Sequence, residues 1–398
     1  MTFHEGWWLI PIVVGHIAFW ICSVNVLHGL GVKEHTVLRW NLTLLTLGCL
    51  TTLALIWSVW SGDWPLIAQA YAMVCLAVGA CALPFTTLLR VLRQYPRGIQ
   101  LRATEWELND RDAYIGQGRY HWMHNIRGNE SLRLRRVEAS MILPGLPSAF
   151  AGLRILHLTD FHFAPCYTER FFEDVSRAAQ AWGEPDLVLF TGDLIDNDEA
   201  IAWVEPVFSS LTARLGKFAI LGNHDLAHDV NGLLAALDLA GFTNLEGRWI
   251  TVEHEGATLA LGGTSTPWGP KLDVRTQPAA DAVIVLSHAP DTFPKFARSG
   301  VNLVLAGHNH GGQIRLPIVG PILMPSRFSR RYDRGVFRRG KTTLFVSQGV
   351  GGKHPLRFGD CMPEIALLTL HSEAISKLQA HPRQRARNGT ELVGSDLS

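Results

Sequence analysis

The chain has 398 residues, which is room for two or three domains of typical size. Its 36 Lys and Arg residues almost balance its 35 Asp and Glu residues, so no overall basic excess indicates nucleic acid as the main partner. The six cysteines are scattered, which argues against a disulfide framework. Hydrophobic residues make up 47% of the chain, with the excess in the N-terminal part.

Three stretches of that N-terminal part contain no charged residue, and each is longer than the about 20 residues that a membrane span needs. We predict transmembrane helices at about 7–27, 40–60 and 64–89. The first stretch lacks a preceding basic region and is followed by two further spans, so a retained helix is favoured over a cleaved signal peptide. Residues 1–92 are therefore predicted to form a three-helix transmembrane anchor.

The basic residues of the short connections predict the orientation of this anchor. They flank the first connection and follow the third span: Lys33, Arg39, Arg90, Arg93, Arg97 and Arg102. Because cytoplasmic loops carry the excess of Lys and Arg, we expect the N-terminus outside and everything after residue 90 in the cytoplasm. This is the topology of a multi-pass protein of the inner (cytoplasmic) membrane.

Polar residues within or near the first span admit two interpretations. His16, Asn25 and His28 would mark a transport path if the helices carried a substrate. The lack of charged residues in all three spans favours a simple anchor and counts against a small transporter with a regulatory domain.

Two segments of the chain are harder to assign. Residues 93–140 are predicted to be a juxtamembrane linker, in which arginines mix with Trp106 and Trp122. This segment fits either a membrane-surface stretch or a strand-bearing start of the next domain. Residues 372–398 are polar and are predicted to be a disordered tail.

Residues 141–371 are predicted to form one soluble domain of the α/β class. Short apolar runs alternate with helical stretches, which indicates a partly parallel, layered sheet covered by helices. We expect strands at 154–159, 186–190, 217–221, 282–287, 302–306, 343–347 and 364–370, and helices at 168–182, 200–215 and 231–240.

The polar residues of this domain gather where predicted strands end. Five strand ends carry Gly, Asp, Asn or His in the groups Asp160-Phe-His162, Gly192-Asp193, Gly222-Asn-His-Asp225, Ser287-His288 and Gly307-His-Asn-His310. Ligands of open α/β sheets bind at the carboxyl ends of strands, so we expect these groups to converge on one cleft. Imidazole and carboxylate suit Mn, Fe or Zn, and a carboxylate can bridge two such ions.

Each of these motifs alone has an ordinary explanation. Gly-Asp is common at turns, and a single histidine such as His288 is more often structural than a ligand. The two longer groups are much rarer. Their occurrence together with the others, all at strand ends, favours a metal site.

At these residues the chain resembles the calcineurin-like metallophosphoesterases, and especially their bacterial branch with N-terminal membrane helices. The resemblance covers about residues 144–370 and is carried by Leu-Thr-Asp-Phe-His, Thr-Gly-Asp-Leu-Ile-Asp, Leu-Gly-Asn-His-Asp, Gly-His-Asn-His-Gly-Gly-Gln-Ile-Arg-Leu-Pro and Pro-Leu-Arg-Phe. It implies a four-layer αββα sandwich. The family commonly has Thr between its last two histidines, where this chain has Asn309, so the effect of that residue on the pocket is open.

The resemblance also implies a site with two divalent metal ions. One ion would be held by Asp160, His162 and His310, and the other by Asn223, His288 and His308, with Asp193 bridging them. His224 would act beside the metals as general acid or phosphate contact, oriented by Asp225.

The implied activity is hydrolysis of a phosphate ester, as a phosphodiesterase or a pyrophosphatase. Tethering to the bilayer favours a lipid-linked substrate such as UDP-2,3-diacylglucosamine, while a broad phosphodiesterase fits equally well. A non-catalytic signalling or scaffold module is the alternative, but no expected ligand is missing. The sequence predicts no oligomeric state.

The arginines cluster at 90–102 and 133–136 rather than within the catalytic motifs, which argues against a nuclease. One basic stretch, residues 327–339, follows the last metal motif. It fits a contact with phosphates or acidic lipids, or a solvated loop.

Overall fold

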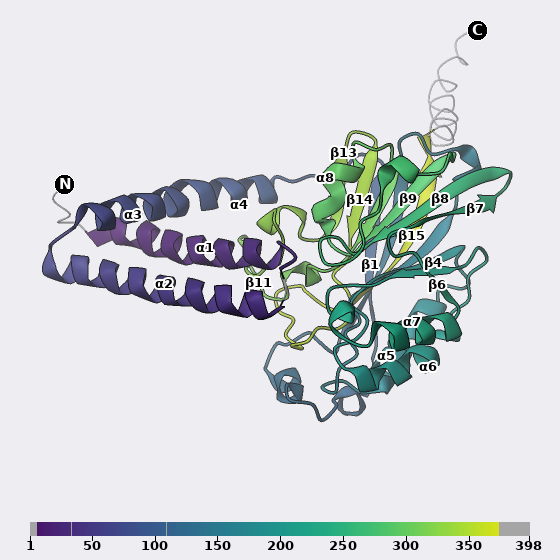
Figure 1. Cartoon of the computed structure of the whole chain (residues 1–398), viewed down its shortest axis with the longest axis horizontal. Helices are drawn as coiled ribbons and strands as arrows, with labels where there is room; N and C mark the ends of the chain where they lie inside the picture. Colours follow the sequence, from purple (N-terminus) through teal and green to yellow (C-terminus); the bar gives the residue numbers. More distant parts are fainter. Residues whose placement is uncertain (1–5, 33, 109, 374–398) are drawn as a thin grey trace, which may run out of the picture.

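The computed structural model describes residues 6–32, 34–108 and 110–373. The predicted tail at 372–398 therefore lies outside the described residues from residue 374 onward. Three apolar helical spans project from one end of a two-sheet domain (Figure 1). The spans are α1 (Leu9–His28), α2 (Glu34–Ser61), and a third made of α3 (Leu66–Ala77), a π-helical turn (Val78–Ala82) and α4 (Leu83–Val91). All three are long and apolar enough to cross a membrane, in agreement with the predicted positions.

Pro84 does not break the third span. A proline cannot donate to the carbonyl one turn back, and the wider π-helical turn directly before α4 accommodates the interruption. The helix therefore continues to Val91.

Polar side chains join the three spans to one another. In α1, His16 Nδ1 lies 2.6 Å from the hydroxyl of Tyr71 in α3, and His16 Nε2 lies 2.9 Å from the hydroxyl of Thr52 in α2. Trp20 also donates to the Tyr71 hydroxyl, over 3.0 Å. Hydrogen bonds of this kind are a usual means by which apolar helices associate.

The first sheet has seven strands in the order β1-β2-β15-β3-β4-β5-β6. Their bounds are β1 (Ile99–Trp106), β2 (Leu134–Leu143), β3 (Arg154–Leu158), β4 (Leu187–Thr191), β5 (Lys217–Ile220), β6 (Phe242–Asn244) and β15 (Glu364–Ser372). Strands β3 to β6 are mutually parallel, which brings the carboxyl ends of β3, β4 and β5 to one edge.

The second sheet has six strands in the order β13-β14-β10-β9-β8-β7. They are β7 (Trp249–His254), β8 (Ala257–Thr264), β9 (Ala282–Ser287), β10 (Leu303–Ala306), β13 (Gly335–Arg339) and β14 (Thr342–Val346). Strands β8, β9, β10 and β14 are parallel. A small antiparallel pair, β11 (Arg315–Leu316) with β12 (Gly320–Pro321), lies outside both sheets.

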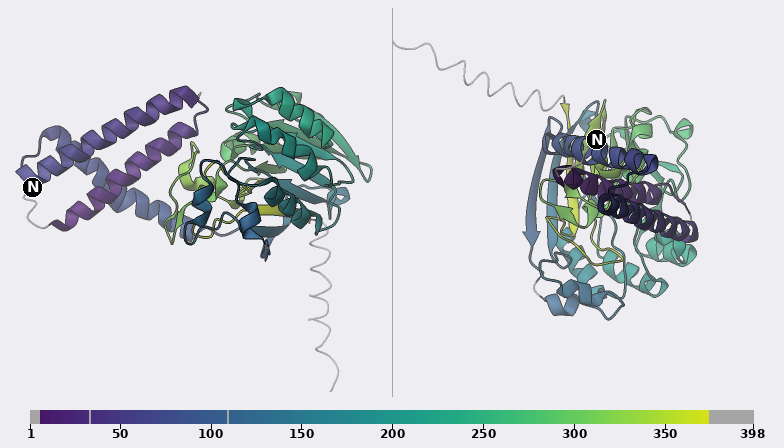
Figure 2. Two further views of the ribbon diagram at one scale, coloured as in Figure 1. Left: turned by 90° about the horizontal axis from the view of Figure 1, so that it is seen from below. Right: turned by 90° about the vertical axis from the view of Figure 1, so that its left-hand side faces the viewer.

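Three buried apolar layers show how these elements stack. The inner faces of the two sheets pack on each other through residues such as Leu189, Ile284 and Leu368. The helices α5 (Glu169–Gln180), α6 (Val204–Phe208) and α7 (Val230–Leu239) cover the outer face of the first sheet through a phenylalanine-rich core. The short α8 (Phe293–Phe296) covers the second sheet. The arrangement is the expected four-layer αββα sandwich (Figures 1 and 2).

One open alternative is resolved, and two predicted boundaries need correction. The strand-bearing interpretation of residues 93–140 is the right one, because β1 and β2 pair as two strands of the first sheet. The boundary at residue 141 therefore cuts through β2. The helix expected at 200–215 ends at Phe208, where Lys217 Nζ donates to the Phe208 carbonyl over 3.1 Å.

Two arginines of the basic stretch at 327–339 are engaged within the protein. Arg334 binds Gln348 and Asp360, and Arg338 donates to the carbonyl of Ile142 over 2.7 Å. A contact with phosphates or acidic lipids, one of the two interpretations of this stretch, therefore does not extend to these two guanidinium groups.

Candidate active site

The five groups of polar residues do converge. Asp160 and His162 follow β3, Asp193 follows β4, and Asn223 with His224 follows β5 in the first sheet. His288 follows β9, and His308 with His310 follows β10 in the second sheet. The site thus lies where the carboxyl ends of parallel strands from both sheets meet, as the sequence predicted.

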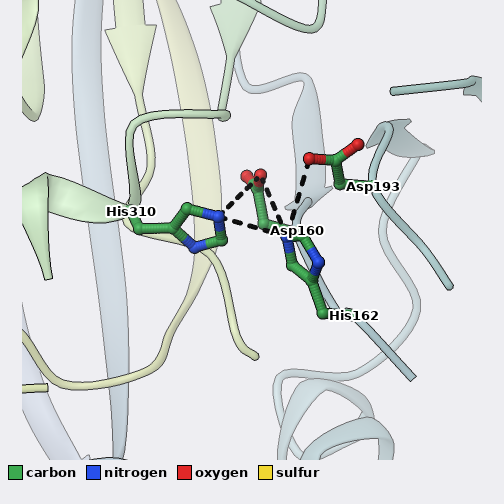
Figure 3. Close-up of side chains that lie close together, drawn as sticks. All are labelled: Asp160, His162, Asp193 and His310. Atoms are coloured by element: carbon green, nitrogen blue, oxygen red, sulfur yellow. Dashed lines mark hydrogen bonds and ion pairs between the residues drawn. The ribbon is translucent and has the colours of Figure 1, made fainter. Parts of the chain in front are cut away.

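Four side chains form a first set of donor atoms (Figure 3). His162 Nε2 lies 3.1 Å from His310 Nε2, 4.0 Å from Asp160 Oδ1 and 3.6 Å from Asp193 Oδ2. His310 Nε2 lies 3.6 Å from the same oxygen of Asp160. All four side chains are mostly or fully buried, and their donor atoms lie within 4.8 Å of one another.

A second set of donor atoms adjoins the first. His288 Nε2 lies 3.2 Å from Asp193 Oδ2, 3.1 Å from Asn223 Oδ1 and 3.1 Å from His308 Nδ1. The oxygen Oδ2 of Asp193 therefore belongs to both sets. This is the arrangement expected of a carboxylate shared by two cations.

The far nitrogen of three imidazole rings is occupied by an acceptor. His162 Nδ1 lies 3.0 Å from Asp196 Oδ2, and His288 Nδ1 lies 2.8 Å from the carbonyl of Thr191. For His308 the roles are reversed, because Nε2 lies 2.9 Å from the Pro325 carbonyl and Nδ1 faces the site. Such acceptors fix the tautomer that leaves a lone pair toward the site, as they do for metal-binding histidines. The donor set therefore fits divalent metal ions.

The backbone is strained at these positions. Among the described residues, ten non-glycine residues have a positive φ, and the expected ligands account for five of them: Asp160, His162, Asp193, His308 and His310. Non-glycine residues in this region cost free energy and concentrate at functional sites.

Glycine is required at two positions beside the candidate ligands. A Cβ atom at Gly222 would collide with Oδ1 of Asp193, and one at Gly307 would collide with Oδ2 of Asp160. The glycines of the two sequence groups thus make room for the carboxylates.

Burial and charge set the protonation of the site. Burial opposes the charge of Asp193, but the charges of His288 and His224 outweigh it and hold the pKa of Asp193 well below its usual value. Burial also opposes protonation of His288, yet Asp193 raises the pKa of His288 to about 9. Burial lowers the pKa of His308 to about 3, so this ring is neutral at pH 7. Cation binding at His288 must displace a proton.

His224 lies beside both donor sets and remains partly exposed. Its ring stands 4.6 Å from that of His162 between centroids, and its backbone N–H donates to Asp193 Oδ1 over 2.8 Å. Its Nδ1 is hydrogen-bonded to Oδ1 of Asp196. Burial opposes the positive charge of His224, but Asp193 and Asp196 outweigh it and raise its pKa to about 9.

The expectation that Asp225 orients His224 is wrong. Asp225 is fully buried, and its carboxylate accepts the backbone N–H groups of Leu194 and Gly222 over 2.7 and 2.8 Å and also that of Ile195. Both of its oxygens are thus used to join the loop after β4 to the loop after β5. Asp196 takes the orienting position instead.

Two further residues shape the site without having been singled out. Asp196 ends the motif Thr-Gly-Asp-Leu-Ile-Asp. Its position three residues after Asp193 is the sequence feature that could have identified it as a site residue. Arg357, from Pro-Leu-Arg-Phe, is buried behind His310, where its Nη2 lies 3.2 Å from Nδ1 of that ring. Asn309 points away from the donor atoms and donates to the Tyr332 carbonyl over 2.8 Å.

Known proteins resemble this chain in sequence. Residues 153–312 match the family model described as calcineurin-like phosphoesterase. An uncharacterized metallophosphoesterase of Bacillus subtilis, YkuE, is 33% identical over 269 residues, which cover 65% of this chain and 90% of that protein. The chain is a calcineurin-like metallophosphoesterase. It is therefore a metal-dependent enzyme that hydrolyses phosphoester bonds, and the non-catalytic alternative is set aside.

Two other relatives of this metallophosphoesterase carry functional names. The phosphodiesterase YaeI of Escherichia coli is 31% identical over 228 residues, covering 55% of this chain and 83% of the relative. The UDP-2,3-diacylglucosamine pyrophosphatase LpxG of Chlamydia muridarum is 26% identical over 315 residues, covering 62% of this chain and 91% of the relative. The family uses a dinuclear divalent metal site, and the cluster of His and Asp side chains described above suits one.

Proposed function

We propose that this enzyme is a membrane-anchored hydrolase of phosphodiester or pyrophosphate bonds, with its catalytic domain on the cytoplasmic side. The position of Asp193 Oδ2 carries the proposal, because this atom lies within 3.6 Å of His162 Nε2 and 3.2 Å of His288 Nε2. A single carboxylate oxygen thus faces two neighbouring groups of donor atoms.

Seven residues hold the two ions in this proposal. One site consists of Asp160, His162, Asp193 and His310, and the other of Asp193, Asn223, His288 and His308. The donor types suit Mn, Fe or Zn. Two such ions, when bound, polarise phosphate oxygens and lower the pKa of a water molecule that attacks phosphorus.

His224 donates the proton to the leaving oxygen. Its Nδ1 is held by Asp196, so Nε2 is the ring nitrogen left to face a substrate. General acids of this kind contribute about 10²–10⁴ in rate. Asp196 also contacts His162, so one carboxylate fixes the positions of a proposed ligand and of the proposed acid relative to each other.

The three helices are proposed to span the inner membrane with the N-terminus outside. The basic residues after the third span support this orientation. Two of them, Arg90 and Arg93, contact the buried Asp333 of the catalytic domain over 3.3 and 3.0 Å. The anchor is thereby fixed to the domain rather than connected by a loose tether.

A lipid-linked phosphate ester is the proposed substrate. The name of the Chlamydia relative indicates the pyrophosphate bond of UDP-2,3-diacylglucosamine, and the name of the Escherichia coli relative indicates a phosphodiester. Of these two substrates, anchoring in a bilayer favours the lipid-linked UDP-2,3-diacylglucosamine.

A panel assay of the purified full chain tests this function. Phosphomonoesters, bis(4-nitrophenyl) phosphate and UDP-2,3-diacylglucosamine in mixed vesicles are compared with Mn²⁺ present. We expect turnover of the diester and the lipid, and its loss in His224→Ala. His228→Ala is the matched control, because His228 lies four residues further along and pairs with the exposed Asp198. Turnover of monoesters alone would contradict the proposal.

A further inference from the structure

The segment 315–328, here called the rim segment, links the catalytic domain to the ends of the apolar helices. Asn25 of α1 donates from Nδ2 to the Ile322 carbonyl over 3.1 Å, and its Oδ1 accepts the N–H of Met324 over 2.9 Å. On the other side, Arg90 of α4 donates to the Ile318 carbonyl over 3.3 Å. Figure 2 shows this light-green segment between the helices and the sheets.

A second bridge to α4 confirms that position. Arg330 donates from Nη1 to the Val319 carbonyl over 2.8 Å and from Nη2 to the Thr86 hydroxyl over 3.1 Å. The rim segment is therefore attached to two different spans.

These attachments set the depth of the rim segment. Helix α1 has 20 residues, which is about 30 Å at 1.5 Å per residue and matches the hydrocarbon core of a bilayer at about 30 Å. Asn25 lies in the last turn of α1, and Thr86 lies within the last two turns of the third span. The backbone that Asn25 binds, and the Val319 carbonyl that Arg330 connects to Thr86, therefore lie at the boundary between acyl chains and headgroups.

The side chains of the rim segment suit that boundary. Leu316, Ile318 and Leu323 are 47%, 75% and 51% exposed within the protein. Phe328 is also exposed, and Arg327 beside it is an exposed cation. Apolar side chains with an adjoining basic residue are typical of surfaces that insert into the headgroup region.

We propose that the rim segment inserts into the bilayer surface and that bilayer lipid is its partner. The segment begins five residues after His310, and its Pro325 carbonyl lies 2.9 Å from Nε2 of His308. The Pro325 carbonyl contacts the ring nitrogen of His308 that faces away from the donor atoms, so a lipid held at this segment lies close to the candidate metal ligands. The proposal rests on the proposed membrane anchoring and adds the surface at which a lipid-linked phosphate is held beside the site.

Photo-cross-linking of the full chain tests the proposal. The photoreactive residue p-benzoylphenylalanine is placed at position 318 or 323 in protein reconstituted into phosphatidylethanolamine–phosphatidylglycerol vesicles, and lipid adducts are measured by mass spectrometry. Position 45 in α2 is the positive control, since Leu45 is an exposed residue of the proposed span. Position 239 at the end of α7 is the negative control, since Leu239 is an equally exposed leucine of the catalytic domain.

We expect lipid adducts at 318, 323 and 45 and none at 239. Adducts at 45 without adducts at 318 and 323 would overturn the proposal while leaving the anchor intact. Absence of adducts at 45 would refute the anchoring itself. Cross-linked dimers at 318 in place of lipid adducts would make the rim segment an interface between two copies of the chain.

Discussion

The imidazole of His224 donates a hydrogen bond from Nδ1 to the carboxylate of Asp196. The second oxygen of that carboxylate lies 3.0 Å from Nδ1 of His162, one of the proposed ligands. Asp196 therefore fixes two rings with different proposed tasks. Its loss should disturb proton donation and metal binding together.

Replacing Asp196 by Asn tests this double role. Removing such an outer partner of a ligand lowers activity or metal affinity by about 10–100-fold. We predict a fall of that size in kcat for bis(4-nitrophenyl) phosphate, with weaker Mn²⁺ binding in a titration of the metal-depleted protein. Asp198→Asn, at an exposed carboxylate two residues away, should change neither. Normal metal affinity in Asp196→Asn would restrict the role of Asp196 to His224.

Replacing Asp225 by Asn should act through stability. The Asp225 carboxylate accepts three backbone N–H groups in the interior, and an amide nitrogen in place of one oxygen leaves a buried donor unmatched. An unsatisfied buried group costs about 1–3 kcal/mol. The midpoint of thermal unfolding in detergent should therefore fall. An unchanged midpoint together with lost activity would instead assign Asp225 a direct part in the chemistry.

Replacing Asn25 by Leu should weaken one metal site. Asn25 binds the backbone of Ile322 and Met324, and the next carbonyl, that of Pro325, lies 2.9 Å from Nε2 of His308. Freeing this loop removes the support of one ligand, so we predict about tenfold weaker binding of one Mn²⁺ equivalent. Asn41→Leu is the matched control, because Asn41 binds only His28 among the described hydrogen bonds. Equal affinities in the two variants would count against a link between anchor and site.

The buried His124 predicts a pH dependence of stability. Burial lowers the pKa of His124 to about 4, below its unfolded value, and its ring nitrogens face the Ser131 hydroxyl and the Cys166 carbonyl. Between pH 6.5 and 4 the unfolded chain binds a proton that the folded chain does not, so stability is complete above pH 6.5 and is lost as the pH falls. The loss amounts to about 3 kcal/mol. His124→Gln should lose less stability than the wild type between pH 7 and pH 5, as measured by thermal unfolding; parallel curves would contradict this.

The sequence predicted the parts of the fold that depend on local pattern. The charge-free stretches gave the three spans, and the apolar runs that end in Asp, Asn or His gave the strands that surround the site. The candidate metal ligands could be predicted from the sequence because each of them lies at a strand end, where its position depends little on distant packing.

What the sequence did not predict depends on long-range partners. The mixture of Arg and Trp in residues 93–140 resembles a membrane-surface stretch, yet Trp106 and Trp182 both pack against the guanidinium of Arg136, at 4.8 and 4.0 Å. That packing exists only once β1 and β2 are paired. The exchange of Asp225 for Asp196 as partner of His224 has the same origin, since sequence proximity to His224 does not decide which carboxylate the folded loops present to it.

The metal content of the wild type and of Asp193→Asn tests the central claim most directly. If Asp193 is shared by two cations, elemental analysis by inductively coupled plasma mass spectrometry should find two divalent ions per chain in the purified wild type. The variant should lose at least one of them, with hydrolysis of bis(4-nitrophenyl) phosphate reduced by at least about 10²-fold. Full metal content and unchanged turnover in Asp193→Asn would contradict the account.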